Sequence, residues 1–491
     1  MELILTSLVS LLLLWFITRI FLKSSTKKNL PPSPSKLPII GNLHQLTSHP
    51  HRGLHSLAQK HGPLMLLHFG SVPVLVVSSA DTAREIMITH HTNFANRPLF
   101  KAMKKLFYDC KDVTFTPYSE YWRQMRSIFV LQMLSNKRVR YFGRVREEEA
   151  ALLVKRIEGC VAASAPVDLR RLIAETNGQV IFRSSFGGRY GETENGKKLL
   201  RLIRVSIGLL GEIHIGDFIP WLGWIGRVNG FDKRLDTTAK EMDQVLESVI
   251  QERQETGQDR DGEDDFLDIL LQIYNQDVSI GRDSIKALLL DVFVGGTDSI
   301  STSLEWTMSE LLRQPRVMEK LQSEVRGIVK QKQRITKDDL EKMGYMKAVI
   351  KENMRLHPPF PLSPRIASKD VQIKGYDIAA GTMAMVSMWA IGRELISWDE
   401  PDKFMPERFL NSSVDFKGQD YELIPFGTGR RACPGIGYAT ASMELVLANL
   451  MQKFDWKLPN GILPKHLDMT ESSGITVHKA LPLLALASRA Q

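Results

Sequence analysis

One loop of the chain limits its possible folds more than any other segment. Residues 421–437 read YELIPFGTGRRACPGIG, and an amphipathic helix is predicted to follow over Tyr438–Phe454. Gly429 and Gly435 allow the backbone to wrap closely around the side chain of Cys433. A thiol at the start of a helix is favoured as the thiolate, because the free N–H groups and the helix dipole stabilise negative charge there.

Three interpretations of this loop compete. In the first it is a dinucleotide-binding turn, since Gly427, Gly429 and Ala432 match G-x-G-x-x-G/A, although too few residues follow to complete a doubly wound sheet. In the second it is a structural loop with a buried, inert cysteine. In the third it holds a haem through the Cys433 thiolate, with Phe426 shielding the sulfur and Arg431 pairing with a haem propionate.

Cysteine usage and charge exclude several other classes of protein. The three cysteines, Cys110, Cys160 and Cys433, are far apart and form no C-x-x-C, which argues against a disulfide framework or a structural zinc site and favours a reducing compartment. A chain that is 43% hydrophobic and 24% charged is globular rather than disordered. The net charge of +9 is spread along the chain, which argues against a nucleic-acid partner and favours a membrane surface or an acidic protein.

The N-terminal segment is predicted to anchor the chain in a membrane. Leu3–Leu22 is apolar, and about 20 residues make roughly 30 Å of helix, enough to cross a bilayer. We therefore expect a transmembrane anchor over residues 1–22 and a basic, proline-rich hinge over residues 23–38. Lysines follow the apolar run, so the positive-inside rule places the rest of the chain in the cytoplasm. A cleaved signal peptide is the alternative, but no basic n-region or small-x-small cleavage site is present.

The remaining residues, 39–491, are predicted to form one large domain, mainly α with minor β. Alternating apolar residues predict a β-hairpin over Leu64–Ser79 that turns near Gly70, and the polar run Glu252–Asp265 predicts a loop. Helices and further short strands are expected where the apolar residues recur with the matching period. The predicted helices are Glu147–Val161, Leu199–Leu210, Lys240–Gln251 and Asp283–Leu312, and the predicted strands are Val371–Ile373 and Met383–Val386.

The longest predicted helix carries an unusual centre, FVGGTDSIST. Gly295 and Gly296 each cost about 1 kcal/mol in a helix interior, so they indicate a close approach or a local distortion. Asp298 and Ser299 follow at once, and a polar pair beside a glycine gap suggests a helix that lines a cavity. An ordinary glycine packing contact with a solvent-facing Asp298 explains the pattern equally well.

With these residues in view, the cysteine loop resembles the haem-binding signature F-x-x-G-x-R-x-C-x-G of the cytochrome P450 family. Phe426, Gly429, Arg431, Cys433 and Gly435 occupy its five fixed positions. The resemblance extends along the whole chain and is similar in style to plant microsomal A-type members. It implies the cytochrome P450 fold, with small β-sheets beside a helical haem-binding domain, and haem b held by the Cys433 thiolate, which promotes O–O cleavage.

Other family motifs follow in the same order along the chain. Glu352 and Arg355 match the E-x-x-R of the K helix, and the segment FMPERF contains Arg408; the resemblance implies that these three charges form a buried structural triad. Trp122 and Arg126 match W-x-x-x-R, which implies that both reach a haem propionate. Arg365, in PLSPRIAS, matches a further propionate arginine.

One departure from the family lies in the long helix, where the pattern is [AG]-G-x-[DE]-T-[TS]. Here Ser299 replaces the threonine and Ile300 the second hydroxyl residue. Asp298 and Ser299 are the implied catalytic pair that relays protons to bound dioxygen. Proton delivery should survive, while its coupling to substrate oxidation is open. The resemblance also implies a substrate pocket, for which ordinary core packing is the equal alternative; its residues are Val292, Gly295, Gly296, Phe360, Leu362, Ser363 and Ile475.

The implied activity is a haem-thiolate monooxygenase that oxidises a small lipophilic plant metabolite, such as a terpenoid, an alkaloid or a phenolic. No flavin or NADPH domain is evident, so the resemblance implies electrons from NADPH–cytochrome P450 reductase, with cytochrome b5 as a further possible donor, and a single-pass location in the endoplasmic reticulum membrane. Two other functions are compatible with a haem site: an isomerase or dehydratase that does not use O2, and a haem-based ligand-binding protein.

Overall fold

The computed structural model describes Ser7 and residues 28–256, 264–276, 280–330 and 332–490. The predicted anchor over residues 1–22 and the start of the hinge, apart from Ser7, lie outside the described residues. No helix in the described part of the chain is long and apolar enough to span a bilayer. The rest of the hinge lies against the body: Asn29 donates to Asp377 at 2.9 Å, and the Leu66 N–H donates to Pro32 O at 2.9 Å.

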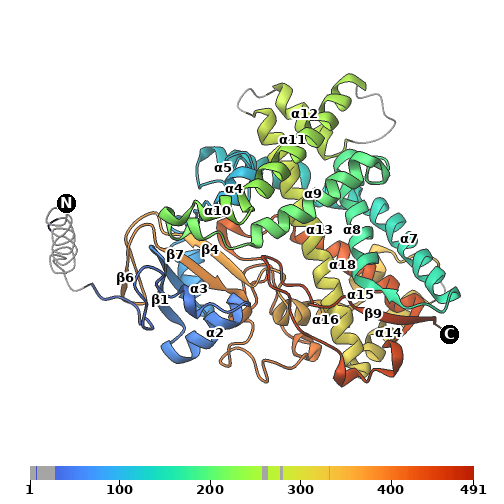
Figure 1. Cartoon of the computed structure of the whole chain (residues 1–491). Coiled ribbons are helices and arrows are strands. Elements are labelled where there is room, and N and C mark those ends of the chain that lie inside the picture. Colours follow the sequence, from blue (N-terminus) through green and yellow to red (C-terminus); the bar gives the residue numbers. More distant parts are fainter. Residues whose placement is uncertain (1–6, 8–27, 257–263, 277–279, 331, 491) are drawn as a thin grey trace.

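Helices make up most of the described chain; the main sheet lies on one side of it, and β9 lies on the opposite side near the C-terminus (Figure 1). The helices are α2 (Pro50–His61), α3 (Ala80–Arg84), α4 (Lys101–Leu106), α5 (Glu120–Ser127), α6 (Asn136–Tyr141), α7 (Gly143–Ala162), α8 (Leu169–Phe186), α9 (Glu194–Gly211), α10 (Ile225–Val228), α11 (Phe231–Thr256), α12 (Phe266–Gln276), α13 (Arg282–Arg313), α14 (Pro315–Val329), α15 (Lys337–Lys342), α16 (Gly344–Leu356), α17 (Met388–Ile391) and α18 (Ile436–Lys453). The strands are β1 (Leu64–Phe69), β2 (Val72–Val77), β3 (Val167–Asp168), β4 (Leu362–Ile366), β5 (Val371–Ile373), β6 (Tyr376–Ile378), β7 (Met383–Ser387), β8 (Phe454–Lys457) and β9 (Leu484–Arg489).

The predicted elements are confirmed, with shifted ends. The four helices expected from apolar periodicity are α7, α9, α11 and α13, and the hairpin is β1–β2. The expected loop over Glu252–Asp265 was wrong at its start: α11 continues to Thr256, and Arg253, in the last turn of that helix, donates to Asp265 at 2.9 Å. A charged run can continue a helix when one of its residues finds a buried partner.

The main sheet has the strand order β1-β2-β7-β4. β1 and β2 pair antiparallel, with Leu64 opposite Val77, whereas β2 and β7 run parallel, with Val74 opposite Met383. β4 then pairs antiparallel with β7. Long-range pairing of this kind brings the segment around residue 365 next to the N-terminal quarter of the chain. Two smaller sheets have the orders β3-β9-β8 and β5-β6.

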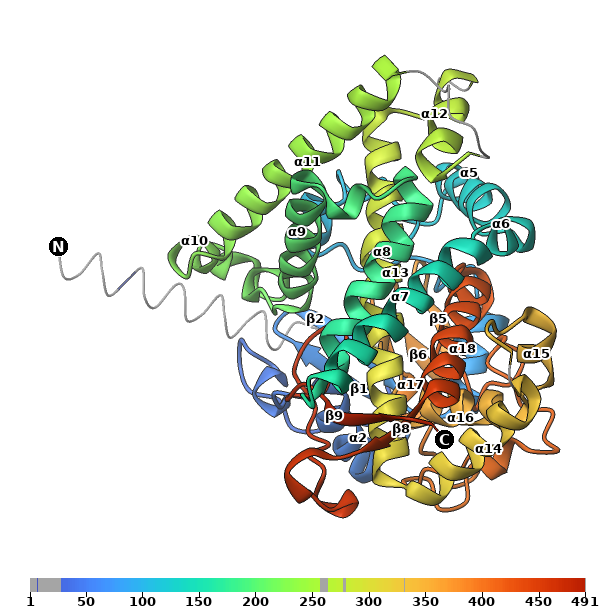
Figure 2. The ribbon, with the colours of Figure 1, turned by 90° about the vertical axis from the view of Figure 1, so that its right-hand side faces the viewer.

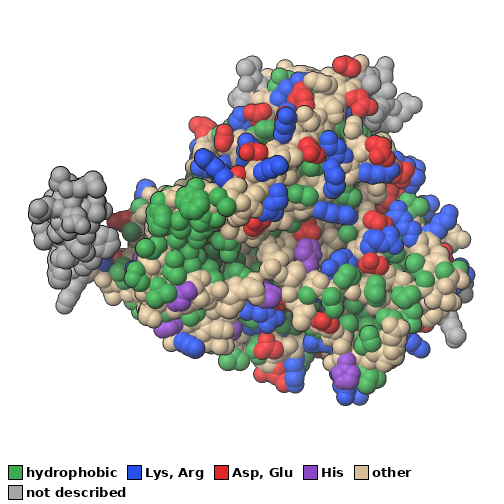
Figure 3. Space-filling view, in the orientation of Figure 1, with side chains coloured by type: hydrophobic (Ala, Val, Ile, Leu, Met, Phe, Trp, Pro, Cys, Tyr) green, Lys and Arg blue, Asp and Glu red, His purple; other side chains and the backbone are tan. Residues whose placement is uncertain are grey.

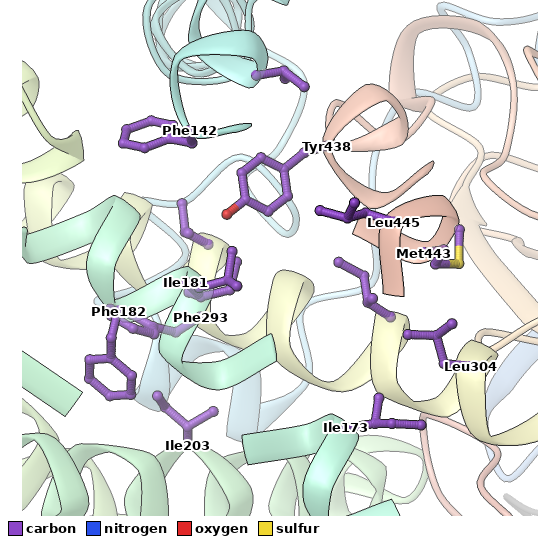
Figure 4. Close-up of a cluster of buried hydrophobic side chains, with 14 of the residues drawn as sticks. Phe142, Ile173, Ile181, Phe182, Ile203, Phe293, Leu304, Tyr438, Met443 and Leu445 are labelled. Carbon is purple, nitrogen blue, oxygen red and sulfur yellow. The ribbon is translucent and has the colours of Figure 1, made fainter. Parts of the chain in front are cut away.

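The long helix α13 runs through the middle of the helical region in both ribbon views (Figures 1 and 2). It packs along α8, and the aromatic rings of Phe182 and Phe293 meet there with centroids 4.9 Å apart (Figure 4). Tyr438 on α18 enters the same cluster and shares a hydrogen bond of 2.9 Å with Ser184. Because α13 is enclosed along most of its length, the polar residues at its centre need a specific reason to be there.

Candidate haem-thiolate site

The cysteine loop is held by its own backbone. The Cys433 N–H donates to Phe426 O at 2.8 Å, and the Ala432 N–H donates to Gly429 O at 3.0 Å. Gly429 has a φ of 70°, and a Cβ there would lie 2.3 Å from Met87 O, so only glycine fits. α18 begins at Ile436, so Cys433 stands just before a helix N-terminus. Residues 410–428, all described, contain no strand, and the strand–turn–helix of a dinucleotide site is therefore missing.

The Cys433 thiol is exposed, yet the protein around it desolvates the sulfur and raises its pKa. The Gly435 N–H, which donates to Sγ at 3.3 Å, and the nearby Arg126 guanidinium act in the opposite direction and favour the thiolate. These groups alone do not offset desolvation. A cation bound to the sulfur would deprotonate it, so the loop has the donor set expected of a metal ligand rather than of an inert core thiol.

Beside the loop, four arginines gather without an acidic partner in any ion pair among the described residues. The four are Arg97, Arg126, Arg365 and Arg431, and 334 positions (431 − 97) separate the first from the last. Burial lowers the pKa of Arg97 to about 10 and that of Arg431 to about 9, and burial together with repulsion by the other three lowers the pKa of Arg365. Arg97 Nε and Arg365 Nε are buried without a hydrogen-bond partner.

Buried, mutually repelling guanidinium groups with unpartnered N–H groups indicate a binding site for a multivalent anion. The two carboxylates of a haem supply that charge, so the residues present fit the group. Arg97 was missed by the sequence reasoning. Its Nη1 donates to Pro364 O at 2.8 Å. An isolated antiparallel bridge between Asn96 and Ile366 brings Arg97 next to Arg365, and the local sequence NRP gives no signal of this.

Two expected propionate contacts have other partners in this structure. Trp122 donates its indole N–H, the one donor of its side chain, to Val113 O at 2.9 Å. Arg431 lies over the Trp122 ring at 4.3 Å and donates to the carbonyls of Ala95, Val113 and Thr116. Both side chains therefore clamp the loop before α5, and a propionate contact would have to replace or share these bonds.

The paired glycines of α13 have different surroundings. A Cβ at Gly296 would lie 2.8 Å from Ile181 Cδ1 on α8, whereas a Cβ at Gly295 would meet nothing within 4 Å. Gly296 therefore permits close helix packing, and Gly295 borders open space. α13 remains one continuous helix, although Asn177 on α8 donates to the carbonyls of Gly296 and Thr297, both at 2.7 Å. Asn177 is a second residue that the sequence reasoning missed.

The predicted acid–hydroxyl pair lies in this stretch. Ser299 donates its hydroxyl to Gly295 O at 2.7 Å, so its oxygen remains free to accept a proton or a hydrogen bond. Asp298 Oδ2 lies 3.1 Å from Nε2 of His478, a residue outside every motif quoted above. Ile300 is buried in the core, which accounts for an apolar residue where the family has a hydroxyl.

The predicted charged triad is formed. Glu352 accepts two hydrogen bonds of 2.8 Å from Arg355 and one of 3.1 Å from Arg408. The Met405 N–H donates to the same carboxylate at 2.7 Å. Glu352 and Arg355 side chains have no exposed surface, so this network fixes the segment before the cysteine loop against α16.

The predicted pocket residues do not form one cluster. Val292 and Ile475 belong to the large core around α13, Phe360 packs on a second cluster beside the sheet, and Leu362 on a third. Ser363 is buried and accepts from Arg97 at 3.3 Å, so its hydroxyl is already engaged.

Comparisons with known proteins agree with this geometry. Residues 31–484 match the family "Cytochrome P450". The chain is 52% identical to "Cytochrome P450 71A8" of Mentha piperita, over 98% of this chain and 95% of that one. It is 48% identical to "Norfluorocurarine oxidase" of Strychnos sp. (99% and 98% covered) and 46% identical to "Tabersonine/lochnericine 19-hydroxylase" of Catharanthus roseus (94% of each).

A solved zebrafish cytochrome P450, in complex with abiraterone, superposes with a TM-score of 0.76 at 25% identity, covering 90% of this chain and all of that one. The chain therefore belongs to the cytochrome P450 family of haem-thiolate monooxygenases, which incorporate oxygen from O2. Its relatives are plant members of the A type, as the resemblance implied.

Proposed function

We propose that this chain is a haem-thiolate monooxygenase that oxidises a small lipophilic plant specialised metabolite, and that the Cys433 thiolate would hold the haem iron. The observation that carries the proposal is the position of Cys433 just before α18, beside four arginines, two buried and two half-buried, whose charge is not balanced by an ion pair in the described part of the chain. The haem, when bound, supplies oxygen activation and insertion.

The residues of the chain have separate tasks in this proposal. Arg97, Arg365 and Arg126 would hold the haem propionates. The Gly435 N–H and the Arg126 charge favour the Cys433 thiolate, and a bound iron would favour it further. Asp298 carries protons from the surface side of α13, and the Ser299 hydroxyl passes them on toward the haem pocket.

The substrate class is argued from the relatives. Two of them are named for alkaloid substrates, norfluorocurarine and tabersonine or lochnericine. The proposed pocket side of α13 presents Val292 and the open space at Gly295, which suit an apolar ring system. We therefore place alkaloids first, before terpenoids and phenolics, among the substrates to test.

The proposed electron donor is NADPH–cytochrome P450 reductase, with cytochrome b5 as an auxiliary. The net charge of +9 suits docking to an acidic flavoprotein. High salt should then slow turnover when reductase is limiting, and turnover that is independent of salt would contradict the electrostatic part of this proposal.

We also propose that residues 1–22 anchor the chain in the endoplasmic reticulum membrane, with the catalytic domain, residues 39–491, in the cytoplasm. A hydrophobic surface supports a membrane-facing side. Trp221, Trp224 and Val228 are 64%, 56% and 76% exposed, and apolar side chains gather on this face around α10 (Figure 3). Exposed tryptophans are typical of the membrane–water interface.

The test begins with the CO difference spectrum of the reduced full-length chain in microsomes. A strongly red-shifted Soret band is expected from thiolate-ligated haem. Reductase, NADPH and the alkaloids tabersonine and norfluorocurarine are then added, followed by terpenoid and phenolic panels, and oxygenated products with 18O from 18O2 are expected. A well-folded chain without the band would overturn the thiolate assignment, and a product formed without NADPH or O2 would instead favour an isomerase or dehydratase.

A further inference from the structure

A short hairpin near the C-terminus contacts the centre of α13. Its arms meet at Glu471 and Lys479, and the Ser472 N–H donates to His478 O at 2.8 Å. Its tip carries Ile475, whose backbone nitrogen lies against Gly211 at the end of α9. The hairpin thus joins an apolar residue of the proposed pocket to a histidine on its returning arm.

His478 is placed between two α13 residues that are one helical turn apart. Its Nδ1 lies 2.8 Å from Thr302 Oγ1, and its Nε2 lies 3.1 Å from Asp298 Oδ2. A Thr302 O–H that donates to Nδ1 fixes the neutral tautomer in which Nε2 carries the proton, on the side of the carboxylate.

Among the described residues, the pair with His478 is the one ion-pair contact of Asp298. Its Oδ2 is buried and makes no well-directed hydrogen bond, so the His478 contact is the one that stabilises this oxygen within the described chain. The contact has the distance of an ion pair, but the ring N–H is not aligned as in a full hydrogen bond. Such a carboxylate can turn away to exchange a proton without breaking a strong bond.

The other charged groups around the hairpin are committed elsewhere. Glu471 accepts from His51 at 2.9 Å and from Arg52, and Lys479 donates to Asp468 O. Glu305 accepts a hydrogen bond of 2.9 Å from Arg170, and Glu310 forms one of 2.8 Å with His357. Among the described residues, His478 is therefore the group that faces Asp298 directly.

We propose that His478 is a positioning residue for Asp298. The His478 ring, oriented by Thr302, holds the Asp298 carboxylate in the position from which it delivers protons to Ser299. The inference rests on the proposed role of Asp298 in the monooxygenase. It also couples proton delivery to the pocket, because a ligand that moves Ile475 displaces the same hairpin.

The experiment compares His478→Leu, which removes both contacts, with His478→Gln, which keeps a donor. Arg52→Gln is the matched control, since it removes an anchor of the same hairpin at Glu471 without touching Asp298. Each full-length protein is assayed with excess reductase, without added substrate, for NADPH oxidation in H2O and D2O. The CO spectrum, the Kd for imidazole and the melting temperature report on the intact haem site independently of turnover.

For His478→Leu we expect NADPH oxidation to fall about tenfold, less than the 10²–10⁴ of losing an acid–base group outright, with a larger solvent isotope effect. The imidazole Kd should stay within twofold, and His478→Gln should recover to within about threefold of wild type. A wild-type rate and isotope effect in His478→Leu, or an equal loss in Arg52→Gln, would overturn the proposal.

If His478→Leu does not fold, Thr302→Val provides the test. This variant should raise the solvent isotope effect, and an unchanged value counts against the proposal. A well-folded wild-type chain without the red-shifted CO band would instead contradict the proposed function itself.

Discussion

Gly296 lies so close to Ile181 that a Cβ at residue 296 would sit 2.8 Å from Ile181 Cδ1. This contact sets the distance between α8 and α13. Substituting Gly296→Ala adds helix propensity of about 1 kcal/mol but overpacks the contact at a cost of about 1–3 kcal/mol. We expect a net loss of stability in thermal unfolding.

The matched change is Gly295→Ala, where a Cβ meets nothing within 4 Å. This variant should be as stable as wild type or more so, with altered ligand binding, because the new methyl borders the proposed pocket. Adding Ile181→Val, which removes Cδ1, should restore the thermal stability that Gly296→Ala loses. If the double variant is no more stable than Gly296→Ala, steric contact with Ile181 is not the cause.

The three cysteines should respond differently to serine. Cys433→Ser should abolish the red-shifted CO band, because a neutral hydroxyl is a poor substitute for a thiolate ligand. Cys110→Ser and Cys160→Ser should retain it: burial raises the pKa of Cys110 to about 12, so it stays a thiol. A band that survives in Cys433→Ser and is lost in either control would move the ligand to that residue.

Glu352→Ala is expected to destabilise the chain by about 3–5 kcal/mol, since it leaves the fully buried Arg355 without its charge partner. The control is Glu341→Gln, which breaks an exposed pair with Lys337 and should change stability by less than about 1 kcal/mol. Urea unfolding followed by circular dichroism compares the two. Equal losses of unfolding free energy would mean that the Glu352 network stabilises the fold no more than an exposed ion pair does.

A feature of this structure could be predicted from the sequence when it depends on residues close together along the chain, and could not when it depends on distant ones. The helix α13 and the hairpin β1–β2 show in the apolar period, and the cysteine loop shows in its glycines, because each depends on neighbours along the chain. Neither the apolar period nor the glycine pattern indicates the positions of Arg97 and His478. Their neighbours in space, Arg365 and Asp298, lie far away in sequence, and one sequence alone does not show which distant residues meet. For the same reason the sequence gives no sign that the indole N–H of Trp122 donates to Val113 O.

The four-arginine cluster predicts opposite effects on the protein with and without haem. Arg97→Gln removes one of the mutually repelling buried charges, and we expect the haem-free chain to gain about 1 kcal/mol of stability. The same change should speed haem transfer to apomyoglobin severalfold, because a counter-charge to the propionates is lost. Arg204→Gln, on the exposed face of α9, should alter neither quantity. Slower haem loss from Arg97→Gln would exclude Arg97 from the propionate site.

Two buried carboxyl groups give a pH dependence with a defined sign. Asp112 and Asp291 lie beside each other under the loop before α5; burial raises the pKa of Asp291 to about 6 and, with repulsion by Asp291, raises that of Asp112. A raised folded-state pKa means that the protonated acid favours the fold. This contribution is complete below the unfolded pKa, about 3.9, and is lost as pH rises through the folded values.

Asp112→Asn removes one of these charges and keeps an acceptor for the Phe115 N–H, which now donates to Asp112 Oδ2 at 2.9 Å. The variant should therefore gain stability over wild type as pH rises from 5.5 to 8, by about 1–2 kcal/mol at the upper end. Melting temperatures of the reduced CO complex across this range measure the difference. Asp109→Asn, in the same loop but exposed, should follow wild type at every pH. A constant difference between Asp112→Asn and wild type would show that Asp112 does not titrate in this range, because only a group that binds protons differently in the two states makes the difference change with pH.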